Sequence, residues 1–281
     1  MSFSCSSPLI TGHDSGGAGA GGDATVETNR FIQVSAGYDH VCGLRRDGTV
    51  ACAGNNDHGD ATPPAGTFAQ IAAGWGFTCG LQGDGSVACW GDKPPFAGPF
   101  TQIAAPYDYV CGLRGDGSVV CWATLGSPLA TTLTGTYTQI SGGGRQICGL
   151  AADGSATCWN WNDCVATPPP PGPFTQISAG GCHVCGLRAG GGAACWGDNT
   201  FGETDVPEGT FAQISAGDSG TCGLRANGTV TCWGWQLSLP AGQMISPPGT
   251  FTQISVDGQM ACGLLADGSI TCWGNPLTLE P

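Results

Sequence analysis

Residues 211–234 read FAQISAGDSGTCGLRANGTVTCWG, and close copies of this phrase run along the chain. Each copy has an aromatic residue, any residue, Gln, Ile or Val, a stretch of small residues, Cys-Gly-Leu, a turn, and a second Cys that Trp usually follows. The opening aromatics are Phe31, Phe68, Phe100, Tyr137, Phe174, Phe211 and Phe251, spaced 37, 32, 37, 37, 37 and 40 residues apart. The first Cys always follows the opening by 11 residues and the second follows it by 10, so length changes fall in the connections. A constant unit with variable connections predicts a stacked repeat architecture.

The composition favours short strands over helices. Among 281 residues there are 50 Gly, which mark tight turns, and only 10% are charged. The net charge of −13 argues against a nucleic-acid partner, because phosphate binding relies on clustered Lys and Arg. It favours a solvated surface and a protein partner of basic character. No stretch is long and apolar enough to span a membrane.

The cysteines recur in pairs that flank a turn. Asp-Gly lies midway in most pairs, Asn227-Gly228 in the sixth and Gly190-Gly191 in the fifth, and such dipeptides between apolar runs predict β-hairpins. A three-residue loop at 46–48 with Gly48 left-handed places Cys42 opposite Cys52, within disulfide reach. We therefore expect one disulfide in each unit: Cys42–Cys52, Cys79–Cys89, Cys111–Cys121, Cys148–Cys158, Cys185–Cys195, Cys222–Cys232 and Cys262–Cys272.

Three cysteines lie outside these pairs. We expect Cys164 and Cys182 to bridge units four and five, which leaves Cys5 as a free thiol or a lipid-anchor residue. Abundant paired cysteines indicate an oxidising compartment, so we expect an extracellular, periplasmic or cell-surface protein. Zinc binding is the alternative interpretation of the pairs. Zinc ligands are usually spaced more closely than 10 residues, which favours the hairpins.

The repeat predicts an all-β fold, a seven-bladed β-propeller. Apolar residues occupy both parities of the first strand in each unit, as expected for sheets that are covered on both faces and stacked around an axis. Each unit is expected to supply about four short strands, for example 211–214, 221–224, 230–233 and a weaker one in the connection at 203–206. A parallel β-helix is the alternative, although its coils are usually shorter and lack a hairpin in each repeat.

The two ends of the chain have different expected roles. Residues 1–22 are rich in Gly and Ser and lack the basic start and apolar core of a signal peptide, so we expect a flexible tail there. The propeller is expected over 23–281, as a monomer. Residues 23–26 are similar to residues 60–63 before the second unit, so an N-terminal strand is expected to complete the seventh blade and close the ring.

The phrase Ser-Ala-Gly, Cys-Gly-Leu, Asp-Gly, Val and Cys-Trp-Gly resembles the regulator of chromosome condensation repeat over about residues 24–274. The stretch at 196–207 is also similar to the connections of β-lactamase-inhibitor protein II, a secreted bacterial propeller of the same superfamily. Cysteines here occupy strand positions that are usually apolar in both relatives, and several connections are Pro-rich, so function does not transfer with the fold. The resemblance implies either an exchange factor for a small GTPase, an inhibitor that caps an enzyme, or an interaction platform.

The sequence shows no catalytic set, metal site or cofactor motif. His13, His40, His58 and His183 lack metal-ligand spacing, and His40 and His183 occupy equivalent positions that suggest a structural role. The Asp-Gly pairs recur at hairpin tips, where turn formation explains them. We therefore predict a protein without enzymatic activity. The alternative, a carbohydrate-binding or hydrolytic propeller, would need the carboxylates Asp39, Asp108, Asp218 and Asp257 to converge at the axial mouth.

A partner-binding face is the favoured functional hypothesis. The loop after the first strand differs most between units and carries exposed-type aromatics, which are typical interface anchors. By resemblance, these positions match those with which the inhibitor propeller contacts its enzyme. The candidate residues are Tyr38, Asp39, Trp75, Phe77, Tyr107, Asp108, Tyr109 and Arg145, joined by Asp198, Asn199 and Phe201 of one connection. In the other interpretation, the aromatics only plug the axial channel.

Overall fold

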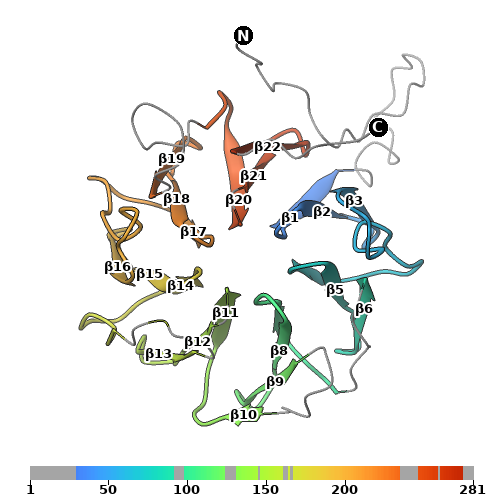
Figure 1. Cartoon of the computed structure of the whole chain (residues 1–281), viewed down its shortest axis with the longest axis horizontal. Coiled ribbons are helices and arrows are strands. Elements are labelled where there is room, and N and C mark those ends of the chain that lie inside the picture. Colours follow the sequence, from blue (N-terminus) through green and yellow to red (C-terminus); the bar gives the residue numbers. More distant parts are fainter. Residues whose placement is uncertain are drawn as a thin grey trace.

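The computed structural model describes residues 30–91, 98–123, 131–144, 146–160, 164, 167–234, 246–258 and 260–274. These residues form seven small antiparallel sheets arranged as blades around a central axis (Figure 1). The predicted all-β, seven-bladed propeller is confirmed. Within these residues, no helix could cross a lipid bilayer.

Each blade is ordered from an inner strand near the axis to an outer strand, and the blades are numbered 1 to 7 along the chain (Figure 1). The inner strands are β1 (Phe31–Ala36), β4 (Gln70–Ala73), β7 (Gln102–Ala104), β11 (Gln139–Gly143), β14 (Gln176–Ala179), β17 (Gln213–Ala216) and β20 (Phe251–Asp257). The middle strands are β2 (His40–Arg45), β5 (Phe77–Leu81), β8 (Tyr109–Leu113), β12 (Gln146–Leu150), β15 (His183–Leu187), β18 (Gly220–Leu224) and β21 (Met260–Leu265). The outer strands are β3 (Val50–Gly54), β6 (Val87–Gly91), β9 (Val119–Ala123), β13 (Ala156–Asn160), β16 (Ala193–Gly197), β19 (Val230–Gly234) and β22 (Ile270–Gly274).

A fourth strand is less common than predicted. In the described part of the chain, only blade 3 has one, where β10 (Thr131–Leu133) pairs with β9. The predicted strand at 203–206 is wrong, because the connection folds back on itself. The Asn199 amide donates to Asp205 Oδ1 at 3.0 Å, and Asn199 Oδ1 accepts from the Thr204 backbone N–H at 2.9 Å. These bonds favour a turn over an extended segment.

The predicted hairpin register is confirmed. In blade 1, Cys42 faces Cys52 and Leu44 faces Val50, and Gly48 has a φ of 86° at the hairpin tip. All seven hairpin disulfides form, with Cα–Cα distances of 4.0–4.1 Å. The predicted Cys164–Cys182 disulfide also forms and joins the connection after blade 4 to the first turn of blade 5. Cys5 lies outside the described residues.

The hydrophobic core lies between the blades. Phe31, Val34 and Val41 of blade 1 pack against Leu264 and Ile270 of blade 7 in one such cluster. Phe31 and Val34 would point to opposite faces of a regular strand, yet both are buried. A register shift between Phe31 and Gln33 relieves this conflict by turning the opening aromatic into the core. A matching shift lies between Phe251 and Gln253 in blade 7, and in these two blades it explains why both parities of the first strand are apolar.

A ring of glutamines links each inner strand to the next blade. The Gln213 amide donates to the Ile254 carbonyl at 3.0 Å, and the Ile254 N–H donates to Gln213 Oε1 at 2.9 Å. The same reciprocal pair is made by Gln33, Gln70, Gln102 and Gln176. Blades 7 and 1 are joined when the Val34 N–H donates to Gln253 Oε1 at 2.8 Å. The ring is therefore closed by contacts between β1 and β20. The closing strand predicted at 23–26 lies outside the described residues.

Candidate functional site

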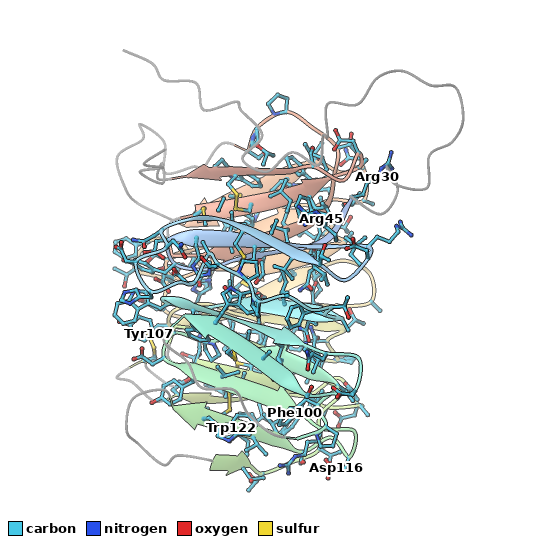
Figure 2. All side chains as sticks on the ribbon, turned by 90° about the vertical axis from the view of Figure 1, so that its right-hand side faces the viewer. Arg30, Arg45, Phe100, Tyr107, Asp116 and Trp122 are labelled. Carbon is cyan, nitrogen blue, oxygen red and sulfur yellow. A yellow bond between two sulfur atoms is a disulfide. The ribbon has the colours of Figure 1, made fainter. Side chains whose placement is uncertain are left out.

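The antiparallel order of the strands gives the propeller two distinct faces. The turns between inner and middle strands and the connections leaving the outer strands meet on one face, because His40 pairs with Gly54 at the same strand ends. We call it the turn face; it includes residues 37–39, 74–76, 105–108, 180–182 and 217–219 with the connections 55–60 and 198–205. The Asp-Gly hairpins form the opposite hairpin face, and Figure 2 shows Tyr107 on one side with Arg30 and Asp116 on the other.

Three aromatic residues form an arc on the turn face. Tyr38, Trp75 and Tyr107 occupy equivalent positions in the first turns of blades 1, 2 and 3. Tyr38 is 46% exposed and Trp75 is 45% exposed. The Trp75 and Tyr107 rings stack with centroids 4.9 Å apart and planes 2° apart. Backbone bonds from Tyr38 N–H to the Gly74 carbonyl, at 3.3 Å, and from Trp75 N–H to the Tyr107 carbonyl, at 3.5 Å, join the three turns. We call these residues the aromatic arc.

Tyr107 is held in an unusual backbone conformation. Its φ of 41° makes it the one described non-glycine residue with positive φ. A tyrosine in this region costs about 1 kcal/mol or more, and such strain tends to occur at functional sites. Tyr107 also lines an axial pocket of about 210 Å³ between the inner strands. Tyr107 therefore fits the interpretation that the aromatics plug the axial channel, whereas Tyr38 and Trp75 are about half exposed to solvent.

The other predicted residues differ in their accessibility. Phe77 is fully buried at the start of β5, where it packs with Val110 and Ile103, so the expectation that it is an exposed anchor is not supported. It shapes the turn above it, because a Cβ on Gly74 would lie 2.6 Å from the Phe77 ring. Asp108 and Tyr109 are half-buried on the turn face. Arg145 lies outside the described residues.

The connection of blade 5 presents a second exposed aromatic region. Phe201 is 41% exposed, and Asp198 and Asn199 are exposed beside it. Hydrogen bonds from the Thr200 hydroxyl, at 2.6 Å, and its backbone N–H lower the pKa of Asp198 below its usual value. The Asn199 side-chain amide makes hydrogen bonds to Asp205 and Thr204 within the same connection, so its main role is to stabilise this turn.

Two of the four carboxylates considered for an axial site do lie together. Burial raises the pKa of Asp257, and the charge of the neighbouring Asp218 raises it further; burial also raises the pKa of Asp218. Asp257 lines the axial pocket with Tyr107. Asp39 instead lies beside His40 of its own blade. The turn face therefore combines the aromatic arc with a pair of partly buried carboxyl groups, whose neutral form burial favours.

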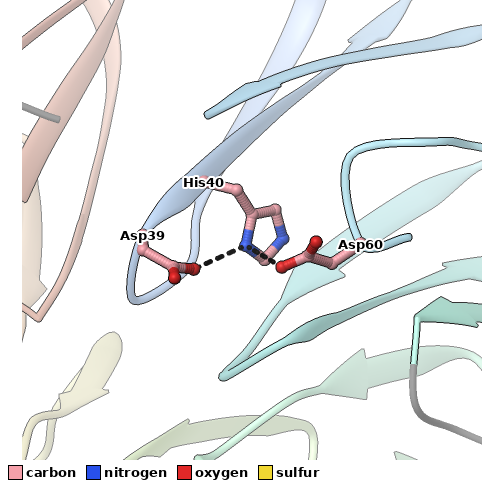
Figure 3. A group of neighbouring side chains, drawn as sticks. All are labelled: Asp39, His40 and Asp60. Carbon is pink, nitrogen blue, oxygen red and sulfur yellow. Dashed lines mark ion pairs between the residues drawn. The ribbon is translucent and has the colours of Figure 1, made fainter. Parts of the chain in front are cut away.

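The two equivalent histidines are buried, as a structural role predicts. His40 Nε2 lies 2.7 Å from Thr78 Oγ1, and His183 Nε2 lies 2.8 Å from Thr221 Oγ1. Blade 1 differs because two carboxylates also approach His40 Nδ1: Asp60 Oδ2 at 3.4 Å and Asp39 Oδ1 at 3.7 Å (Figure 3). Burial raises the pKa of Asp60, and the electrostatic effect of the neighbouring His40 opposes that shift. Asp60 was missed from the sequence because it is 20 residues from His40.

The comparisons agree with this geometry. The profile of the regulator of chromosome condensation (RCC1) repeat matches residues 31–60, 68–92, 174–203 and 211–237. Curated protein sequences give no match. The ectodomain of the receptor kinase CR4 from Physcomitrella patens is 27% identical with a TM-score of 0.74, over 90% of this chain and 76% of that chain.

Two further solved structures share the fold. The CRINKLY WD40 ectodomain of the Arabidopsis thaliana receptor kinase ACR4 is 24% identical with a TM-score of 0.75, over 88% of this chain and 98% of that chain. Prp20p from Saccharomyces cerevisiae, described with its binding to Gsp1p and histones, is 15% identical with a TM-score of 0.70, over 87% and 82%. At these identities the likeness shows the fold alone. The disulfides are consistent with an extracellular protein.

Proposed function

Because this chain is a seven-bladed propeller that contains RCC1 repeats, we propose that it is a secreted, non-enzymatic protein that binds a protein partner through its turn face. The half-exposed Trp75 ring, stacked on the partly buried Tyr107 beside the half-exposed Tyr38, is the observation that carries the proposal. Exposed aromatic clusters of this kind are typical of binding hot spots.

The surroundings of the arc support binding at low entropic cost. The three turns are tied to one another by backbone hydrogen bonds, and the blades beneath them each contain a disulfide. A preorganised surface loses little conformational freedom when a partner docks. The net charge of −13 favours a partner with basic groups.

The extracellular location rests on a separate argument. Eight disulfides form in the described residues, and such density is typical of proteins that fold in an oxidising compartment. The likeness to a receptor-kinase ectodomain, at 27% identity, supports the same location.

Partner capture from the extracellular medium of the source cells tests the proposal. Immobilised oxidised protein should retain a specific protein that quantitative mass spectrometry identifies. Trp75→Ala should weaken its affinity about 30-fold, the equivalent of about 2 kcal/mol for a hot-spot residue. Ile32→Ala is the matched control, because Ile32 is 48% exposed but lies at the opposite end of β1.

The same screen separates the alternatives. If Trp75→Ala and Ile32→Ala bind equally well, the turn face is not the interface. A clear hit on a glycan array or a hydrolase panel would favour a carbohydrate-directed propeller, and nucleotide exchange on a small GTPase would favour an exchange factor. Inhibition of a serine β-lactamase is one specific form of the proposed function, and purified enzyme tests it directly.

A further inference from the structure

Three metal-ligand atoms converge where the first turn of blade 1 meets the connection to blade 2. They are Asp39 Oδ1, His40 Nδ1 and Asp60 Oδ2, all within 4.8 Å of one another (Figure 3). The side chains of His40 and Asp60 are 0% and 1% exposed, whereas that of Asp39 is 37% exposed. Both oxygens of Asp60 and Nδ1 of His40 are buried without a hydrogen-bond partner.

The hydrogen-bond pattern shows what this cluster requires. Thr78 Oγ1 lies 3.4 Å from the Asp60 carbonyl, to which its hydroxyl can donate, and 2.7 Å from His40 Nε2. A proton on His40 Nε2 satisfies both contacts. A neutral His40 with its proton on Nε2 has a bare lone pair on Nδ1. That lone pair then faces two carboxylates in a buried setting, which is costly unless a cation lies among them.

The spacing of the three atoms fits a zinc-class ion. With bonds of about 2.0 Å in a tetrahedral site, neighbouring ligand atoms lie about 3.3 Å apart. The observed separations of 3.4 Å and 3.7 Å from His40 Nδ1 are close to that value. One imidazole nitrogen with two carboxylates suits zinc better than calcium or magnesium, which prefer oxygen ligands alone.

We propose that Asp39, His40 and Asp60 form a mononuclear site for a divalent cation of the zinc class. Thr78 holds the imidazole in place through its other nitrogen, Nε2, as hydrogen-bond partners of metal-bound histidines commonly do. The partly exposed Asp39 side of the cluster gives the ion its path from solvent, which would supply the remaining ligand. The bound ion would tie the turn next to Tyr38 to the connection at 55–60 and so fix one end of the aromatic arc.

Blade 5 provides a natural comparison within the same chain. His183 and Thr221 repeat the His40–Thr78 pair. However, the position of Asp39 is taken by Cys182, which is in a disulfide. The position of Asp60 is taken by Glu203, whose Oε2 accepts from the Phe201 backbone N–H at 2.8 Å. The carboxylate is thus already paired, and no such cluster of ligand atoms occurs elsewhere in the described residues.

The test is calorimetric titration of oxidised, chelator-treated protein with Zn²⁺, without a polyhistidine tag. The wild type should bind one ion at this site. Asp60→Asn should weaken binding at least 100-fold, and Asp39→Asn, a change at a partly exposed residue that leaves the core intact, at least 10-fold. Glu203→Gln is the matched control and should bind within about 3-fold of wild type.

A second probe reports the coordination itself. Co²⁺ added to the metal-free protein should give the intense visible absorption of a four-coordinate site, and Asp39→Asn should abolish or shift that band. The proposal is overturned if Zn²⁺ does not bind, or if Asp60→Asn and Asp39→Asn bind as tightly as wild type. It is also overturned if nuclear magnetic resonance shows His40 doubly protonated at pH 7 and unchanged by Zn²⁺.

Discussion

Replacing Gln213 with alanine should show how strongly the glutamine ring stabilises the propeller. The change removes two hydrogen bonds to Ile254, of 3.0 and 2.9 Å. Each is worth about 1 kcal/mol net, and the Ile254 N–H and carbonyl left unpaired in a partly buried site add to the cost. We therefore expect the free energy of unfolding to fall by about 2–4 kcal/mol, a large share of a typical total of about 5–15 kcal/mol.

Urea unfolding of the disulfide-intact protein, followed by tryptophan fluorescence, measures this cost. Gln82→Ala is the control, because Gln82 only accepts a hydrogen bond from Ser86 within a hairpin tip. Its loss should cost less than about 1 kcal/mol. If Gln213→Ala costs under about 0.5 kcal/mol, or no more than Gln82→Ala, the glutamines do not hold the blades together and the reasoning fails.

Three other predictions concern ionisation and crosslinks. Burial lowers the pKa of His183 from 6.5 to about 4, so its stabilising neutral state is complete above pH 6.5 and is lost as pH falls toward 4. Between pH 7 and pH 4 this should cost the wild type about 3 kcal/mol of its free energy of unfolding. His183→Gln should lose about 3 kcal/mol less than wild type over the same pH range, and equal losses in the two proteins would contradict the prediction. Burial and the charge of Asp218 raise the pKa of Asp257. Above about pH 4 the unfolded state loses this proton while the folded state keeps it, so the free energy of unfolding falls as pH rises. Asp257→Asn should therefore melt higher than wild type at pH 8 but not at pH 3.5. Replacing both Cys222 and Cys232 with serine should lower the free energy of unfolding by about 3 kcal/mol from chain entropy, and an unchanged urea midpoint would refute that.

The hairpins could be predicted in detail because their signals are local. The loop between paired cysteines has constant length, and Gly at its tip permits the left-handed conformation, so the register follows from counting residues. The connections could not be predicted in this way. Whether 203–206 becomes a strand depends on competing side-chain hydrogen bonds from Asn199, which composition does not reveal.

The candidate face was only partly predictable. Tyr38 and Trp75 are exposed as expected, but Phe77 is buried because it occupies the same register position as His40 at the start of its strand. That equivalence was readable from the repeat, but position alone does not fix burial, because Tyr109 at the same position of blade 3 is half-buried. The approach of Asp60 to His40 depends on how a connection folds over the next blade, which spacing alone does not indicate. The recurring Gln was visible, but its reciprocal bonds across blades need the three-dimensional arrangement.

The hairpin disulfides each begin and end within a single blade, and in the described residues only Cys164–Cys182 reaches from one blade to its neighbour. Apart from the two units that Cys164–Cys182 joins, a gene segment that encodes one unit could therefore be duplicated or deleted without leaving an unmatched thiol. Oxidative folding is then a set of short-range pairings between cysteines 10 residues apart, which can be made as each hairpin emerges during synthesis. Such modularity would let a lineage change the circumference of the ring while retaining its crosslinking chemistry.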